Sequence, residues 1–283
     1  MYNGLWEWGE TLTCSCVYDM KKKGDRSSFS ARLTFMQNYI FDLYGTLIDI
    51  ETDEESESFW QDMCEYYNDF GTSYSPMELK RRYHEYCNRE EKALIGDYPE
   101  IKLEKVFLSL LEEGGGYSPI DRYEWTLLCA QYFRALSRKK LVTYKDTITL
   151  LKTLKQQEKR VYLLSNAQTC FTLDEMLKCK ITPYFNGIYI SSDYGVKKPS
   201  RDFMEILLKN ERLKVEESVM IGNDLTSDIC VASKVGMKSI FINSYHHDVE
   251  TLQKEAACLG DYHDYVQVDS LTDVLTMVKE KKR

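Results

Sequence analysis

Short apolar runs alternate with helical patterns along most of this 283-residue chain, and this alternation constrains the fold more than any other feature. The runs are rich in Ile, Val, Leu, Tyr and Phe without strict polar alternation, which is typical of strands buried on both faces of a parallel sheet. The predicted strands are Asn38–Asp42, Val161–Ser165, Gly187–Ser191, Ser218–Gly222, Ser239–Asn243 and Tyr265–Val268. The predicted helices between them are Asp146–Gln157, Thr169–Lys178, Arg201–Asn210, Leu225–Val235 and Leu271–Lys279. This order predicts an α/β fold with a doubly wound parallel sheet.

The stretch between Asp49 and about Leu141 interrupts this order, because no strand is expected there. Helices are expected instead, starting at the capping sequences Thr52–Glu55, Ser75–Glu78 and Ser118–Asp121. The predicted organisation is a leader (1–35), an α/β core (36–50 and 142–283) and an all-helical cap (51–141) inserted after the first strand. Such a cap would cover the strand ends where open α/β sheets bind ligands.

Composition excludes several classes of function. The net charge is -8 and no long basic stretch is present, so nucleic acid is not an expected partner. No apolar run approaches the roughly 18 residues of a membrane span. The nine Cys and four His do not fall at zinc-ligand spacing, and reduced thiols in a cytoplasmic protein are expected. The first 35 residues lack periodicity, so we expect a disordered leader outside the fold, with a binding arm built on Trp6 and Trp8 as the alternative.

One segment presents a carboxylate at a strand end. In Tyr39–Asp49 an apolar run ends at Asp42, and Gly45 allows the chain to turn sharply. A carboxylate at the carboxyl end of the first strand of a doubly wound sheet points into the ligand crevice. Asp42 is therefore a candidate functional residue, although by itself it could equally cap a turn.

Four segments in register resemble the motifs of the haloacid dehalogenase-like hydrolase superfamily. Asp42–Leu47 resembles the first motif, a nucleophilic Asp followed two residues later by a variable position and then Gly-Thr-Leu. Leu163–Asn166 resembles the second motif, Lys198-Pro199 the third, and Met220–Asp228 the fourth. The resemblance covers about Met36 to Asn243, and the helical insertion lies where this family places its cap. It implies a Rossmann-like core, a small-molecule substrate and hydrolysis.

The resemblance also implies roles for individual residues. Asp42 would attack the substrate and form a covalent aspartyl intermediate. Lys198 would keep Asp42 ionised and offset charge that develops on the substrate. Asp228 would complete the catalytic set by helping to activate water. Substrate contacts are expected from four further residues, namely Tyr44, Thr46, Ser165 and Asn166.

Two departures from the family pattern bear on the reaction. Tyr44 stands where the phosphatases have an Asp that protonates the leaving group, and a phenol with a pKa of about 10 is a poor proton shuttle. Asn223 stands where the fourth motif usually has a Mg²⁺-binding Asp. A halide leaves without a proton and without a metal, so a haloacid-dehalogenase-type site without a cofactor is the favoured prediction.

Two alternatives remain at this point. The first is a Mg²⁺-dependent phosphatase of small phosphomonoesters, with the metal held by Asp42, Asn223 and Asp224. The second is a non-catalytic binding protein on the same fold. A dehalogenase would also need an arginine to clamp the substrate carboxylate, and the cap offers Arg81, Arg82 and Arg89. The sequence leaves the physiological substrate and the oligomeric state open.

Overall fold

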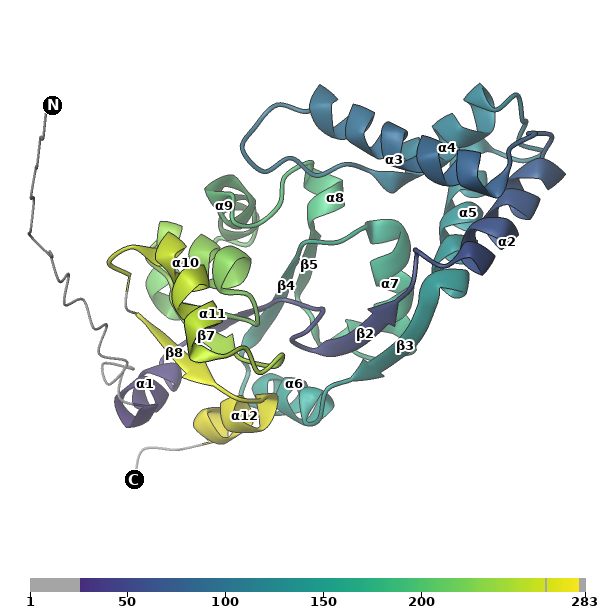
Figure 1. Cartoon of the computed structure of the whole chain (residues 1–283). Coiled ribbons are helices and arrows are strands. Elements are labelled where there is room, and N and C mark those ends of the chain that lie inside the picture. Colours follow the sequence, from purple (N-terminus) through teal and green to yellow (C-terminus); the bar gives the residue numbers. More distant parts are fainter. Residues whose placement is uncertain (1–25, 263, 280–283) are drawn as a thin grey trace, which may run out of the picture.

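The computed structural model describes residues 26–262 and 264–279, and a six-stranded parallel sheet forms its centre (Figure 1). The strands are β1 (Asn38–Phe41), β4 (Arg160–Ser165), β5 (Gly187–Ile190), β6 (Ser218–Gly222), β7 (Lys238–Ile242) and β8 (Tyr265–Val268). Their order is β5-β4-β1-β6-β7-β8, so β1 lies between β4 and β6 with a register of Phe41 opposite Leu163 and Ile221. The predicted α/β fold is confirmed. Because all six strands run in one direction, their carboxyl ends meet along one edge.

Helices cover both faces of the sheet, because neighbouring strand residues point to opposite sides. Tyr39 and Phe41 pack with helices on one face, whereas Ile40 packs on the other. The first face is covered by α1 (Arg26–Leu33), α6 (Thr147–Gln156), α7 (Thr169–Lys178) and α12 (Leu271–Lys279). The second face is covered by α9 (Arg201–Asn210) and α10 (Cys230–Lys234).

Shorter elements lie in the connections between these strands and helices. They are η2 (Thr182–Tyr184), α8 (Ser191–Tyr194), η3 (Val215–Glu217), the π-helical turn η4 (Leu225–Ile229), α11 (Val249–Glu255) and η5 (Ala256–Leu259). The predicted helix over Leu225–Val235 is therefore formed by η4 followed by α10.

Four helices form a separate cap above the sheet edge (Figure 1). They are α2 (Glu57–Asp69), α3 (Pro76–Ala93), α4 (Leu103–Glu113) and α5 (Arg122–Ser137). Their apolar faces enclose an aromatic core that includes the fully buried Trp125 and Phe107. Phe171 of α7 joins this core and stacks on Phe133 of α5 at 5.9 Å between ring centroids. The cap thus rests on α7, which packs against the sheet as well.

The connection between core and cap differs from the prediction. β2 (Ile48–Thr52) and β3 (Arg138–Thr143) pair antiparallel, so the expectation of no strand in this stretch was wrong. Thr52 lies in β2, and α2 begins only after Ser56. The third predicted capping site was misplaced by a few residues, since Asp121 caps α5. The second was correct, because Ser75 accepts from the backbone of Glu78 at the start of α3.

The leader expected over residues 1–35 is wrong for its last ten residues. Phe29 and Leu33 of α1 are buried in the core, in the same cluster as residues of α12. Burying these apolar side chains against the core removes them from water, which favours docking of α1. The proposed arm with Trp6 and Trp8 lies outside the described residues. Seven cysteines occur in the described part, and all are free thiols. Across the same ranges, no helix combines the length and apolar character needed to cross a bilayer.

Candidate active site

Asp42 lies directly after β1 at the carboxyl edge of the sheet, with its backbone N–H donating to Ile221 at 3.0 Å. The chain then turns through Gly45, whose φ of +79° is a conformation that L residues resist. A Cβ at position 45 would lie only 2.4 Å from Asn223 Nδ2, so glycine is also required for close packing. This turn holds the nearly buried carboxylate of Asp42, which is 7% exposed, at the mouth of the strand.

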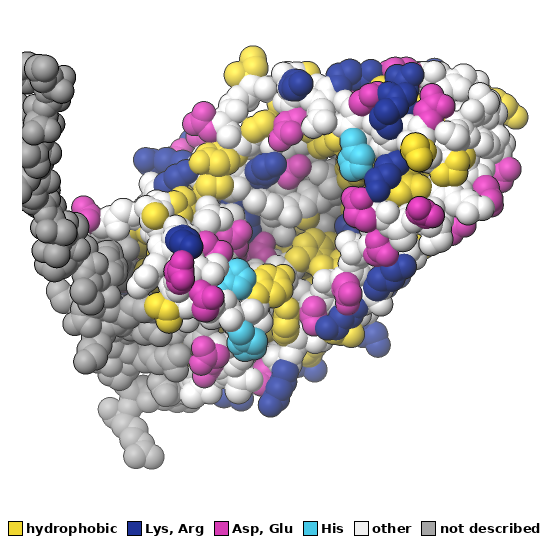
Figure 2. Space-filling model, in the orientation of Figure 1, with side chains coloured by type: hydrophobic (Ala, Val, Ile, Leu, Met, Phe, Trp, Pro, Cys, Tyr) yellow, Lys and Arg dark blue, Asp and Glu magenta, His cyan; other side chains and the backbone are white. Residues whose placement is uncertain are grey.

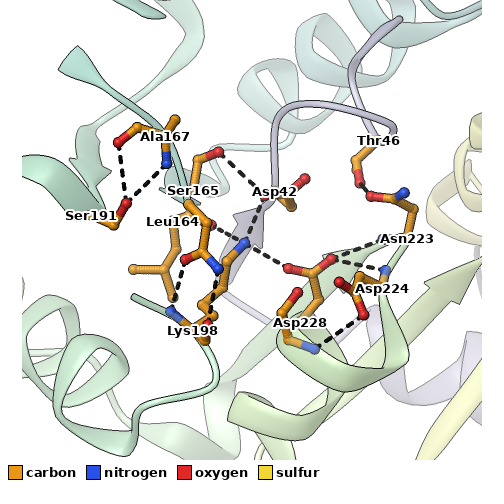
Figure 3. A network of polar contacts seen from close by, with 12 residues as sticks. Asp42, Thr46, Leu164, Ser165, Ala167, Ser191, Lys198, Asn223, Asp224 and Asp228 are labelled. Carbon is orange, nitrogen blue, oxygen red and sulfur yellow. Dashed lines mark hydrogen bonds and ion pairs between the residues drawn. The ribbon is translucent and has the colours of Figure 1, made fainter. Parts of the chain in front are cut away.

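Lys198 is the centre of the polar network in Figure 3. Its side chain is 1% exposed, and Nζ donates to Asp42 Oδ1 and Asp228 Oδ1 at 2.6 Å each and to the Leu164 carbonyl at 2.7 Å. All three ammonium protons are therefore used. One positive charge is shared between two carboxylates, which keeps Asp42 oriented at the sheet edge.

Asp228 joins the loop after β6 to this network. Its Oδ2 accepts from the backbone N–H groups of Asn223 and Asp224 at 3.0 and 3.1 Å. Any Cβ at position 222 would lie 2.2 Å from this carboxylate, so Gly222 makes the approach possible. Burial raises the pKa of Asp228 to about 7, with the charge of Lys198 acting in the opposite direction.

The two residues that follow β4 have different positions. Ser165 donates its hydroxyl to Asp42 Oδ1 at 3.3 Å and faces the cavity. The amide of Asn166 instead holds the backbone of Lys198, donating to its carbonyl at 2.9 Å and accepting from its N–H at 2.7 Å. The structure therefore brings both residues to Asp42, but the Asn166 side chain positions Lys198 in this state.

Tyr44 lines the cavity, but its hydroxyl is engaged elsewhere. It donates to Glu175 of α7 in a short hydrogen bond and lies 3.1 Å from Thr172 Oγ1. Glu175 is fully buried and forms ion pairs with Arg134 at 3.3 Å and Arg138 at 3.5 Å. Burial, with a further contribution from the charge of Glu175, raises the pKa of Tyr44 well above its ordinary value. The phenol therefore keeps its proton and connects the loop after β1 to the base of the cap.

The remaining predicted residues cluster around the loop after β6. Thr46 is buried and donates to Asn223 Oδ1 at 3.0 Å, so it positions Asn223 and does not line the cavity. Asp224 caps η4 through Oδ1, which accepts from Thr226 N at 2.7 Å and Ser227 N at 3.2 Å. Both Asn223 and Asp224 lie on the cavity wall next to Asp42.

A cavity of about 360 Å³ opens above this network. Figure 2 shows the surface hollowed between cap and core, with acidic and histidine side chains on the core side of the hollow. Its lining comprises Asp42, Tyr44, Ser165, Asn166, Lys198, Asn223, Asp224, Thr226, Ser227, Asp228, Tyr245, His247 and Glu255. Three of these residues, namely Tyr245, His247 and Glu255, were not predicted from the sequence. The signal was present, since Tyr245 and His247 follow a predicted strand whose carboxyl end lies at the same sheet edge.

The cavity wall could hold a magnesium ion. Among the described residues, Asp42 and Asp224 each keep one carboxylate oxygen without a hydrogen-bond donor, and the Asn223 carbonyl has a second lone pair beside the one used by Thr46. Mg²⁺ is commonly bound by one or two carboxylates completed by water and substrate phosphate oxygens, which this donor set fits. Among residues 26–262 and 264–279, no group of three or more His, Cys, Asp or Glu side chains is arranged to hold a metal.

None of the three cap arginines proposed as a carboxylate clamp lines this cavity. Arg81 pairs with Glu85, Arg82 lies 3.7 Å from the same carboxylate, and Arg89 pairs with Glu113. All three are substantially exposed on α3, where they stabilise the helix surface.

Comparison with known proteins gives a family match over most of the chain. Residues 39–242 match the model of a family described as haloacid dehalogenase-like hydrolase. The glyceraldehyde 3-phosphate phosphatase of Methanocaldococcus jannaschii is 27% identical over 141 residues, which is 50% of this chain and 58% of that protein. The chain thus spans little more than half the length of this relative. The pyrimidine 5'-nucleotidase PynA of Streptococcus pneumoniae is 24% identical over 242 residues, covering 81% of this chain and 93% of its own.

Solved structures agree on the fold. A 2-haloacid dehalogenase from Pseudomonas syringae superposes with a TM-score of 0.57 at 16% identity, covering 86% of this chain and 98% of that one. A phosphatase from Thermococcus onnurineus gives a TM-score of 0.54 at 17% identity, with the same two coverages. A dehalogenase and a phosphatase thus share this fold, so the fold alone does not distinguish between the two reactions.

Proposed function

Because this chain belongs to the haloacid dehalogenase-like hydrolase family, we propose that it hydrolyses small phosphomonoesters through a covalent intermediate on Asp42. The observation that carries this proposal is the convergence of Asp42, Ser165 and Lys198 on one polar cavity. Curated relatives with phosphatase and nucleotidase activities support this alternative over the dehalogenase-type prediction that the sequence alone favoured.

The geometry supports a division of labour among these residues. The free Oδ2 of Asp42 attacks phosphorus and the bond to the leaving oxygen breaks, which leaves the phosphoryl group on Asp42. Lys198 holds Asp42 in place through Oδ1 and can offset charge that develops on the phosphoryl group, and the Ser165 hydroxyl can turn to a phosphoryl oxygen. Water then attacks phosphorus, releases phosphate and restores the carboxylate.

Magnesium would be held by Asp42, Asn223 and Asp224, where it would neutralise charge on the phosphoryl oxygens. Asn166 keeps Lys198 in place through both ends of its amide. Thr46 does the same for Asn223. These two residues therefore act on the reaction through the groups that they position.

The proposal is tested with phosphate release from a panel of nucleoside monophosphates, sugar phosphates and 4-nitrophenyl phosphate, each with and without Mg²⁺. Asp42→Asn keeps the shape and removes the nucleophile, so it should abolish turnover of every substrate that the wild type accepts. The exposed Asp202 on α9 provides the matched control, and Asp202→Asn should retain wild-type rates. Phosphate release that persists in Asp42→Asn contradicts the proposal, as does its complete absence in the wild type.

A dehalogenase-type reaction is a second candidate, and one specific observation favours it. The Tyr44 hydroxyl donates to Glu175, so the position that supplies the acid in phosphatases does not do so here, and the metal-ligand position carries the neutral Asn223, which is a weaker ligand than Asp. A halide would leave without either. Halide release from 2-chloropropionate that is insensitive to chelator would establish this candidate and overturn the phosphatase.

A further inference from the structure

The proposed reaction needs a proton donor that position 44 does not provide. An alkoxide leaving group of a phosphomonoester departs poorly unless it is protonated as the bond to phosphorus breaks. The Tyr44 phenol donates to Glu175, and its pKa is raised by burial. Both carboxylate oxygens of Asp228 accept hydrogen bonds, one from Lys198 and the other from backbone N–H groups. Asp224 caps η4 through Oδ1, and its other oxygen would face the metal. The donor must come from elsewhere on the cavity wall.

His247 lies on that wall together with Asp42 and Ser165. It belongs to the loop after β7, and the side chain of Asn243 holds its backbone at both polar atoms. Asn243 Oδ1 accepts from His247 N at 2.9 Å, and Asn243 Nδ2 donates to His247 O at 3.1 Å. This double contact fixes the backbone of His247 at the cavity wall.

The imidazole is oriented by two neighbours. Its Nδ1 lies 3.3 Å from Glu255 Oε1 at the end of α11, and the Tyr245 ring stacks against it with an interplanar angle of 24° and 6.0 Å between centroids. Within the described residues Nε2 has no hydrogen-bond partner, so it is free to meet a substrate. A carboxylate on one nitrogen and an open second nitrogen is the arrangement of a general acid–base histidine.

Tyr245 is a poorer candidate for the same task. Burial and the charge of Asp42 raise the pKa of its phenol, which makes it a weaker acid. Imidazole, in contrast, changes charge near neutral pH. His247 is the one histidine among the described residues that line the cavity. Its neighbour His246 is exposed and does not line it.

We propose that His247, paired with Glu255, is a catalytic residue that replaces the missing acid at position 44; this rests on the proposed phosphatase function. The His247 imidazolium gives its Nε2 proton to the leaving alkoxide while the bond from phosphorus to that oxygen breaks and the bond to Asp42 forms. The neutral imidazole then accepts a proton from the water that attacks the phosphoryl group on Asp42. Inorganic phosphate, alcohol, free Asp42 and protonated His247 result, so the cycle balances.

The test compares two substrates that differ in leaving group. An alkyl phosphate needs protonation of its leaving oxygen, whereas 4-nitrophenyl phosphate releases a stable phenolate. We expect His247→Asn to lower kcat/KM for the alkyl phosphate about 100-fold and for the aryl phosphate less than about 5-fold. Glu255→Gln should also lower kcat/KM for the alkyl and the aryl phosphate, each by a smaller factor than His247→Asn does. His246→Asn is the matched control, because Asn tolerates the positive φ of this position, and it should leave both rates unchanged.

Each outcome decides the assignment. Equal losses for both substrates in His247→Asn would mean a structural role and overturn it, as would no loss for either. Thermal unfolding of each variant checks that the loop change leaves the fold intact. If the wild type hydrolyses neither substrate, the phosphatase proposal fails and this assignment fails with it. If the wild type hydrolyses both substrates and His247→Asn affects the two rates equally, only the role of His247 is overturned and the phosphatase proposal stands.

Discussion

Replacing Lys198 by Met tests the energetic core of the site. Met has an unbranched side chain that fills similar space, so the change chiefly removes the ammonium. Lys198 is 1% exposed and lies 2.6 Å from the carboxylates of Asp42 and Asp228, so its loss leaves two acidic groups buried without their cation. Removing one partner of a buried ion pair costs about 3–5 kcal/mol. We expect the free energy of unfolding at neutral pH to fall by about that amount.

Urea unfolding followed by circular dichroism measures this loss. The matched control is Lys197→Met, since Lys197 is partly exposed and a surface charge contributes at most about 1 kcal/mol. The loss in Lys198→Met should shrink near pH 5, because Asp228, whose pKa burial raises to about 7, is then protonated and carries no unpaired charge. Adding Asp228→Asn to Lys198→Met should recover part of the stability, since one buried charge disappears. A loss below about 1 kcal/mol, or one independent of pH, would refute the buried pairing.

Three further predictions follow from the same network. Tyr44→Phe removes a donor from the buried Glu175 and should lower the free energy of unfolding by about 1–3 kcal/mol in urea titrations, and an unchanged value would contradict the contact. Asn223→Asp adds a negative charge beside Asp42 and should tighten Mg²⁺ binding about tenfold by calorimetry, whereas unchanged binding would remove Asn223 from the metal site. The raised pKa of Asp228, about 7 against 3.8, means that its contribution to stability is fully present below pH 3.8 and is lost as the pH rises through 7. The free energy of unfolding of the wild type relative to Asp228→Asn should accordingly decrease across this window, and a flat or rising difference would contradict the shift.

Much of the sheet is predictable from local sequence. The run at Ser218–Gly222 has the predicted bounds, because a strand buried on both faces needs continuous apolar residues. The edge strand Tyr265–Val268 also has the predicted bounds, although its residues alternate between buried and partly exposed. Asp42 and Lys198 meet because parallel strands share one carboxyl edge. The end of the first predicted strand by itself indicated Asp42, whereas Lys198 was recognised only through the resemblance to a known family.

The features that the sequence did not predict depend on contacts between segments that lie far apart in the chain. β2 and β3 carry many charged residues and lack a strong apolar pattern, so only their mutual pairing makes them strands. Glu175 is a charged residue on a helix face, and its complete burial depends on Arg134 and Arg138, which lie far earlier in the chain. No local pattern reports such a partnership.

The loop that carries His247 has a similar explanation. Its place beside Asp42 follows from the position of β7 in the sheet, next to β6 and one strand away from β1. The predicted strand Ser239–Asn243 was correct in kind, but strand order is not visible in the sequence. The sequence therefore indicates that the residues after β7 lie at the carboxyl edge of the sheet, but only the topology shows that their loop borders Asp42.

The most direct test is chemical identification of the intermediate. The enzyme is mixed with a turned-over phosphomonoester, quenched rapidly in acid, digested and analysed by peptide mass spectrometry. A phosphoryl group should be found on the peptide that contains Asp42, and it should be absent from Asp42→Asn. Turnover without any adduct at position 42, or an adduct that survives the substitution, would contradict nucleophilic attack by this carboxylate.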